Sequence, residues 1–191
     1  MRRKILPVNR ALQTAGEYLE EARLKRCVSI KQLASNLKLT EEDILNIENG
    51  NSDINFFSFT AYIFYFRLDT AIFLLLKNNF QHIIFELNGQ IKVRASTNHL
   101  RFVRKLISYL VIIRKISKLT KFTVSERSGL DIATINLLET LQDVRLVDFF
   151  AYCFALHALK PIVEALSFRY DEFGNKIIVA KLRNKELFDY D

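Results

Sequence analysis

The sequence predicts a mainly α fold with small β-hairpins, built from two tandem copies of one unit. Glycine and proline are scarce, with five and two residues among 191, and this composition favours long helices over a loop-rich or all-β fold. Half of the residues are hydrophobic, so the chain can bury a substantial core and lacks the composition of a disordered protein. The third observation is a repeat, because shifting the chain by 91 residues aligns its two halves.

Identical residues mark this repeat along the whole half. The pairs are Arg10 with Arg101, Tyr18 with Tyr109, Leu19 with Leu110, Arg23 with Arg114, Leu39 with Leu130, Ile44 with Ile135, Glu48 with Glu139, Phe59 with Phe150 and Leu75 with Leu166. The alignment predicts two domains, 1–98 and 99–191, each consisting of one helical repeat followed by a β-hairpin.

The apolar periodicity and the capping residues predict five helices in the first half. Ser29 and Thr40 are placed to cap the second and third helices, and Gly50 to end the third. The expected helices are 10–26, 30–37, 41–49, 54–66 and 69–78. Asn88-Gly89 between β-rich runs then predicts a hairpin over 83–94, since a tight two-residue turn needs positive φ at both positions.

The second half repeats this plan. Thr120 and Asp131 are placed to cap helices, and Gly129 suits the turn between them. The expected helices are 100–117, 121–128, 132–141, 146–156 and 161–165. Strands are expected at 166–170 and 176–182, on either side of Gly174-Asn175, with a further strand at 186–190.

Each half resembles the lambda-repressor/Cro-type (XRE-like) helix-turn-helix family. The most specific stretch is Ile47-Glu48-Asn49-Gly50, which follows Ile44 at helical spacing. The second half keeps Ile135, Leu138 and Glu139 at the matching positions. The resemblance covers about residues 10–78 and 101–165 and excludes the hairpins. Lys38 stands where the second half has Gly129, and this departure predicts a strained or altered turn in the first repeat.

The resemblance implies duplex DNA as the ligand, with the third helix of a repeat in the major groove and the second helix pointing its N-terminus at a phosphate. The implied DNA-binding residues of the second repeat are Thr120, Lys121, Arg127, Asp131, Ile132, Ala133, Thr134 and Asn136. Those of the first repeat are Ser29, Lys31, Thr40, Glu42 and Asp43. Because Glu41, Glu42 and Asp43 are consecutive acids, the first repeat is expected to read DNA poorly.

The same resemblance implies two structural ion pairs. Arg23 precedes Glu48 by 25 residues, and Arg114 precedes Glu139 by 25. A partly buried pair would lock the first helix of each repeat against the third. The alternative is that these residues are solvated surface charges.

The charge pattern also distinguishes the halves. The chain carries a formal charge of +7, which suits an anionic partner or serves solubility alone. Between Gln90 and Leu130 there are ten basic residues and one acid, Glu126. A solvated helix face would be expected to interleave acids with the bases. The scarcity of acids in this segment therefore favours contact with the DNA backbone.

Other partners and chemistries follow from what remains. The Phe-rich helix 54–66 carries too many rings for one helix face. This helix and the hairpins could therefore form contacts with the other half of the chain, with a second copy in a homodimer, or with a protein partner. No catalytic residues, metal site or cofactor are expected, because the three histidines are scattered and no phosphate loop occurs. His157 is expected to pack in the core. Cys27 and Cys153 suit a reducing cytoplasm, and no membrane partner is expected.

Two functions remain open on the sequence. The first is a cytoplasmic, sequence-specific DNA-binding transcriptional regulator, nucleoid-associated when bound, in which the second repeat reads DNA better. The alternative is a protein-interaction module of helix-turn-helix fold, antitoxin-like or anti-regulator, that has lost DNA binding in one or both repeats. In either case the chain is expected not to be an enzyme.

Overall fold

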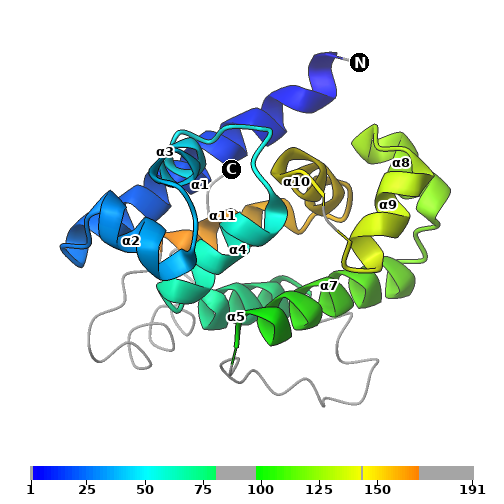
Figure 1. The fold of residues 1–191 in the computed structure, drawn as a ribbon. Helices are drawn as coiled ribbons and strands as arrows, with labels where there is room; N and C mark the ends of the chain where they lie inside the picture. The colour runs from blue at the N-terminus through cyan, green and yellow to red at the C-terminus, as the bar shows by residue number, and fades with distance from the viewer. Residues whose placement is uncertain (1, 81–97, 143, 168–191) are drawn as a thin grey trace, which may run out of the picture.

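The computed structural model describes residues 2–80, 98–142 and 144–167, and these residues form ten helices (Figure 1). The helices of the first repeat are α1 (Arg2–Lys25), α2 (Ile30–Leu37), α3 (Glu41–Glu48), α4 (Phe56–Tyr65) and α5 (Asp69–Asn79). Those of the second repeat are α7 (His99–Ile116), α8 (Lys121–Ser128), α9 (Ile132–Glu139), α10 (Leu146–Ala155) and α11 (Leu159–Leu166). Every expected helix is present; α1 begins eight residues earlier than expected, and α11 is three residues longer.

The predicted β-hairpins are wrong for the part of the chain that the structure describes, which is mainly helical and contains no β-strand. A strand was expected to begin at Leu166, but Leu166 is the buried last residue of α11. It belongs to the helix because it continues the buried helical face of Leu159 and Ile162. The remaining hairpin segments, 83–94 and 168–190, lie outside the described residues.

The predicted helix caps are present in both repeats. The Ser29 hydroxyl accepts a hydrogen bond from the Gln32 amide, and the Gln32 side chain accepts one from the Ser29 amide. Thr40 and Asp43 make the same reciprocal arrangement at the start of α3. Thr120 and Asp131 cap α8 and α9 through the amides of the residues three positions later. These caps satisfy amides that would otherwise lack a partner at a helix start.

The turn between the second and third helices is the same in both repeats. Lys38 has φ 57° and Gly129 has φ 79°, so both residues adopt the left-handed conformation. Of the strained or altered turn expected at Lys38, the turn is unaltered, and the strained, left-handed conformation of the lysine is confirmed. A lysine here keeps the turn at an energetic cost, because a Cβ crowds the following carbonyl in this conformation.

The repeats match with an offset of 91 as far as the third helix and with an offset of 90 beyond it. Lys38 matches Gly129, but Arg67 with φ 58° matches His157, which has the same φ. The helices α4 and α10 start 90 residues apart, and so do α5 and α11. The expected matches of Phe59 with Phe150 and of Leu75 with Leu166 are therefore displaced by one residue, because the second repeat is one residue shorter in the connection that follows the third helix.

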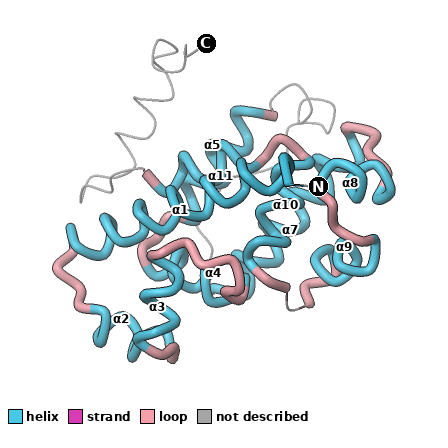
Figure 2. Tube along the Cα trace, turned by 90° about the horizontal axis from the view of Figure 1, so that it is seen from above, coloured by secondary structure: helices cyan, strands magenta, loops and turns pink. Residues whose placement is uncertain are grey.

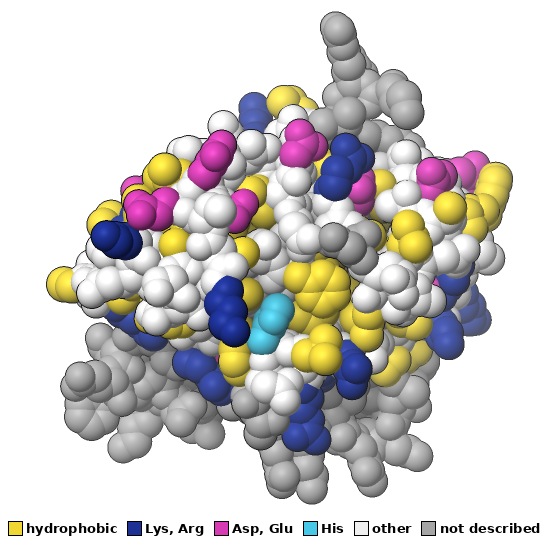
Figure 3. Space-filling model, viewed as in Figure 1, with side chains coloured by type: hydrophobic (Ala, Val, Ile, Leu, Met, Phe, Trp, Pro, Cys, Tyr) yellow, Lys and Arg dark blue, Asp and Glu magenta, His cyan; other side chains and the backbone are white. Residues whose placement is uncertain are grey.

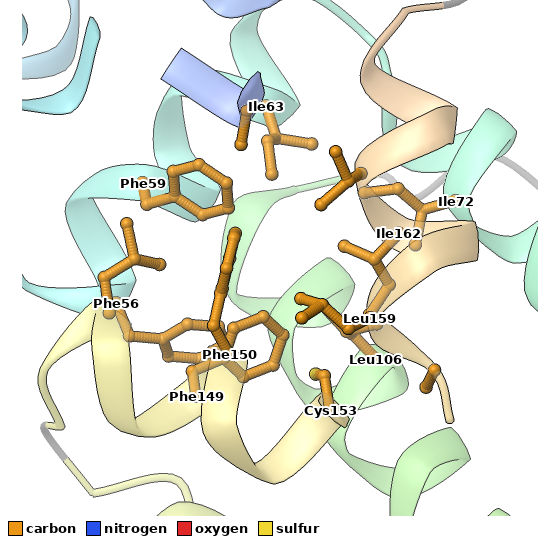
Figure 4. Close-up of a cluster of buried hydrophobic side chains, with 14 of the residues drawn as sticks. Phe56, Phe59, Ile63, Ile72, Leu106, Phe149, Phe150, Cys153, Leu159 and Ile162 are labelled. Carbon is orange, nitrogen blue, oxygen red and sulfur yellow. The ribbon is translucent and has the colours of Figure 1, made fainter. Parts of the chain in front are cut away.

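The two repeats share a single hydrophobic core. Helix α1 packs against α10 and α11 of the other repeat, and α7 packs against α4. Figure 4 shows the centre of this core, where rings of α4 meet rings of α10. The ring centroids of Phe56 and Phe149 are 4.4 Å apart, and those of Phe59 and Phe150 are 5.5 Å apart. The Phe-rich helix thus buries much of its aromatic surface against the other half of the same chain.

His157 does not pack in the core as expected. It is exposed, and it lies at the turn between α10 and α11 with φ 58°. The helix ends at Ala155, so the apolar pattern around His157 spans the end of one helix and the start of the next.

No single helix among the described residues is long and apolar enough to cross a membrane. The helices α4 and α5 reach that length and composition only as a pair, and they are bent by 104° relative to each other.

Candidate functional site

Both ion pairs that the spacing predicted are present, and each includes a tyrosine. In the first repeat, Nε and Nη2 of Arg23 donate to the two carboxylate oxygens of Glu48 at 2.6 and 2.8 Å. The Tyr62 hydroxyl donates to Oε1 of Glu48 at 2.5 Å. Only 7% and 4% of the Arg23 and Glu48 side chains are exposed. This network ties α1, α3 and α4 together within the repeat.

The second repeat builds the same network and adds a lysine. Arg114 donates to Glu139 at 2.6 and 3.1 Å, and the Tyr152 hydroxyl donates to Oε1 of Glu139 at 2.7 Å. Lys121 Nζ lies 3.3 Å from Oε2 of Glu139. Tyr62 and Tyr152 are 90 residues apart, so they do not align when the two halves are compared at an offset of 91. The lysine has no counterpart in the first repeat, where Ile30 stands at that position.

Burial and hydrogen bonding in these networks shift the pKa of Glu139 and of both tyrosines. Burial alone would raise the pKa of Glu139, but the hydrogen bonds from Arg114 and Tyr152 and the neighbouring positive charges outweigh it and lower that pKa. Burial and the adjacent carboxylate raise the pKa of Tyr62 and of Tyr152. Both tyrosines therefore remain neutral donors at neutral pH, which suits a structural network.

The N-terminal ends of α8 and α9 form the exposed part of the second repeat that the sequence assigned to DNA. Thr120 is exposed at the cap of α8, and Ile132 and Ala133 are exposed in the first turn of α9. Asn136 lies one turn further along α9 and is also exposed. Positions 132, 133 and 136 share one face of the helix because residues three and four apart lie side by side.

Some assigned residues of the second repeat are partly engaged within the chain. Lys121 Nζ donates to Oδ1 of Asn136 at 2.5 Å, in addition to its contact with Glu139. Asp131 accepts a hydrogen bond from the amide of Thr134, which is half-buried. The carboxylate thus serves the cap, and the backbone and side-chain hydrogen bonds from Thr134 lower the pKa of Asp131.

Arg127 lies apart from Thr120 and Lys121, at the C-terminal end of α8. It borders a hollow of about 440 Å³ with His157 and Ser117, from the turns beside the second repeat. The structure therefore does not bring Arg127 to the N-terminus of α8, where a phosphate contact was expected.

In the first repeat, the assigned polar residues serve largely as caps. The hydroxyls of Ser29 and Thr40 are bound at the starts of α2 and α3, and the Asp43 carboxylate accepts from the Thr40 amide. The other two assigned residues, Lys31 and Glu42, are exposed, and Lys31 borders a hollow of about 660 Å³ beside α2.

The charges of the two repeats differ more than their backbones do. Residues 98–142 carry eight basic and three acidic side chains, whereas the matching residues 7–51 carry six basic and seven acidic ones. Figure 3 shows acidic side chains over α3 and apolar side chains that reach the surface over α8 and α9. An anionic duplex would therefore be attracted to the second repeat more strongly than to the first.

Two exposed apolar residues at this end were missed from the sequence. Phe122 in the first turn of α8 is 62% exposed, and Leu137 of α9 is 45% exposed. With Ile132, which is 43% exposed, they make the surface less polar than a site that binds only phosphate. The available signal was the repeat itself, because Lys31 and Asn46 stand at the matching positions of the first repeat.

No protein-family model matches the chain, and neither a curated protein nor a solved structure has significant similarity to it. Among the described residues, no group of three or more histidine, cysteine or carboxylate side chains could hold a metal ion. Cys27 and Cys153 are both free, the first exposed and the second buried. Assignment of a function therefore depends on the surface chemistry of the two repeats.

Proposed function

We propose that the chain is a sequence-specific DNA-binding protein of the lambda-repressor/Cro-type helix-turn-helix family that regulates transcription. Its principal reading surface would be the exposed start of α9 beside the capped start of α8. The paired short helices, the left-handed turn at Gly129 and the buried Arg114–Glu139 anchor support the family assignment. The role is binding without catalysis. The free cysteines suit the cytoplasm, where the chain would associate with the nucleoid.

The observation that carries this proposal is the composition of the exposed first turns of α9. Ile132 and Ala133 can contact a thymine methyl group, and the Asn136 amide can hydrogen-bond an adenine edge. The buried Arg114–Glu139 pair holds α9 against α7, so these side chains are presented from a rigid element. The Thr120 cap leaves the positive end of the α8 dipole near the same surface, where it favours a phosphate.

Lys121 has a more specific role than a phosphate contact alone. Its ammonium is placed between Glu139 and Asn136, at 3.3 Å and 2.5 Å. It can therefore orient the Asn136 amide while it adds positive charge beside the start of α8. Replacing Lys121 would weaken binding to every duplex and also relax the base preference that Asn136 sets.

Selection from random duplex DNA tests the proposal. We expect the full chain to enrich a defined sequence, with an affinity that falls steeply as salt rises. The triple variant Lys121→Ala, Thr134→Ala, Asn136→Ala should lose the enriched sequence. A control with the same loss of one positive charge is Lys160→Ala on α11, whose side chain is 78% exposed; it should keep the enriched sequence. Equal binding by the triple variant and the wild-type chain would refute the assignment to α8 and α9.

The second candidate is a protein-interaction module, favoured by the exposed Phe122 and Leu137. Apolar side chains at this exposure suit a protein interface as well as a thymine-rich groove. If no duplex is enriched and the affinity for DNA does not change with salt, the protein-interaction function replaces the DNA-binding function. Phe122→Ser, which removes the ring from an exposed position, should then abolish partner capture without lowering stability.

A further inference from the structure

The two repeats are related by a pseudo-twofold axis that passes between Asn55 and Arg145. These residues form an isolated antiparallel bridge. The Phe56 amide donates to the Val144 carbonyl at 3.0 Å, and the Leu146 amide donates to the Ile54 carbonyl at 2.6 Å. The two bonds are equivalent, because Phe56 matches Leu146 and Ile54 matches Val144 at an offset of 90. Such a reciprocal exchange is the mark of an isologous, twofold contact.

The packing of the helices follows the same axis. Helix α4 contacts its equivalent α10, and α5 contacts its equivalent α11. The contact of α1 with α10 is matched by that of α7 with α4. In Figure 1, α2 and α3 lie on one side of the α4–α10 pair and α8 and α9 lie on the other. One chain thus has the arrangement that a dimer of single repeats would have.

Short connections join the two candidate reading helices to this bridge. Residues 49–54 connect the end of α3 at Glu48 to Asn55, and residues 140–144 connect the end of α9 at Glu139 to Arg145. Figure 2 shows α5 at the opposite side of the molecule from α3 and α4. The axis therefore has one end at the bridge, to which both reading helices are connected, and the other end between the contacting equivalents α5 and α11.

We infer that one chain reads a duplex site of two inverted half-sites that differ in sequence, one under α9 and the other under α3. This inference rests on the proposed DNA-binding function. A protein with twofold symmetry matches a DNA site with a dyad, with half-sites about one helical turn apart. Because the protein is only pseudo-symmetric, its site is pseudo-palindromic in position and unlike in sequence.

The exposed residues specify how the half-sites differ. At the positions of Ile132 and Ala133 in α9, α3 carries Glu41 and Glu42, and both glutamates are exposed. Carboxylates accept hydrogen bonds from the cytosine amino group, whereas apolar side chains contact the thymine methyl. The α9 half-site is therefore thymine-containing and strong, and the α3 half-site contains cytosine and is weak, since its acids repel phosphates.

Little affinity comes from the centre of the site. Arg145, which is beside the axis, has a guanidinium 3.0 Å from Asp148 and 3.7 Å from Asp53. The two carboxylates offset its charge. The base preference is consequently set at the two half-sites, and the intervening base pairs are read weakly.

The test is selection of duplexes with the full wild-type chain, followed by native mass spectrometry of the complex. We expect one motif with two inverted, unlike halves about 10 base pairs apart, and one chain per duplex. A single half-site, two halves in direct orientation, or two chains per duplex would overturn this inference while the DNA-binding function stands. Failure to enrich any duplex would overturn both.

A second variant tests the α3 half-site directly. Glu41→Ile with Glu42→Ala gives α3 the first turn of α9, at two exposed positions where the fold is not at stake. The selected motif should become more palindromic, and affinity for a site with two α9-type halves should rise about tenfold. An unchanged motif and affinity would overturn the role of α3.

Discussion

The two repeats use the same internal skeleton and present different surfaces. Both bury an arginine, a glutamate and a tyrosine in one network, and both use left-handed residues at the same turns. Their exposed first turns of the third helix differ completely, with two glutamates in α3 and an isoleucine and an alanine in α9. Residues that hold the repeat together have stayed alike, and residues free to contact a ligand have diverged.

The largest effect is expected when the buried network of the first repeat is broken. Glu48→Gln leaves the buried Arg23 with only the half-exposed Glu20 carboxylate, 3.9 Å away, as a counter-charge, which should lower the free energy of unfolding by about 3–5 kcal/mol. Glu139→Gln should cost less, because the second network is slightly more exposed. Urea unfolding followed by circular dichroism measures both.

The control for this prediction is Glu21→Gln, which breaks an exposed ion pair with Lys25 and should cost less than about 1 kcal/mol. If Glu48→Gln costs no more than this control, the network does not anchor the repeat.

The next effect concerns the approach of the first helix to the third. A Cβ on Gly16 would lie 2.2 Å from the Glu48 carbonyl oxygen, so Gly16→Ala should cost about 1–3 kcal/mol by overpacking. The second repeat has Ile107 at this position, buried to 2% exposure. There the opposite change, Ile107→Ala, should cost about 2–5 kcal/mol by leaving a cavity. A stabilising Gly16→Ala in thermal unfolding would contradict the close approach.

Substitutions in the turn between the second and third helices should change the free energy of unfolding in opposite directions in the two repeats. Lys38→Gly relieves a left-handed lysine and should stabilise the chain by up to about 1 kcal/mol. Gly129→Ala should destabilise it by about 1 kcal/mol through the backbone alone, because a Cβ there meets no atom within 4 Å. Urea titrations resolve both; changes of the same sign would show that the turns are not equivalent.

The smallest effect is a pH dependence that arises at His99, where the second repeat contacts Thr60 of the first. His99 Nε2 lies 2.9 Å from the Thr60 hydroxyl, and burial lowers the pKa of His99. The unfolded chain therefore binds this proton more readily, so stability is full above about pH 6.5 and falls as pH drops below it.

His99→Val tests this dependence, because valine stands at the matching position of the first repeat, where Val8 is buried. Thermal unfolding between pH 7.5 and 5.5, above the usual titration of carboxylates, should lose part of its pH dependence in the variant. Parallel curves for variant and wild-type chain would exclude His99 as the cause.

Local signals made most helices of the described part predictable. Ser29, Thr40, Thr120 and Asp131 are capping residues, and their effect is confined to the next few amides. The Arg–Glu pairs were implied by the family resemblance, with support from the equal spacing in both halves. The helices start or end within a few residues of the expected positions, with α1 the exception.

The parts that depend on tertiary packing were not predictable. The change of register from 91 to 90 was hidden because adjacent Phe149 and Phe150 both resemble Phe59. The reciprocal bridge at Asn55 and Arg145 is made by backbone atoms, so the types of the side chains could not predict it. The exposure of Phe122 was missed because an apolar ring is normally expected inside a protein. The strand expected at Leu166 was wrong, since this residue continues the buried face of α11.

The most direct test of DNA reading by α8 and α9 is the affinity of the full chain for its selected duplex across a salt series. For the wild-type chain we expect a steep fall of affinity with salt. Exchanging the first turn of α9 for that of α3, by Ile132→Glu with Ala133→Glu, should weaken binding by at least about tenfold. Equal affinity and equal salt dependence in the exchanged variant would contradict a reading surface on α9.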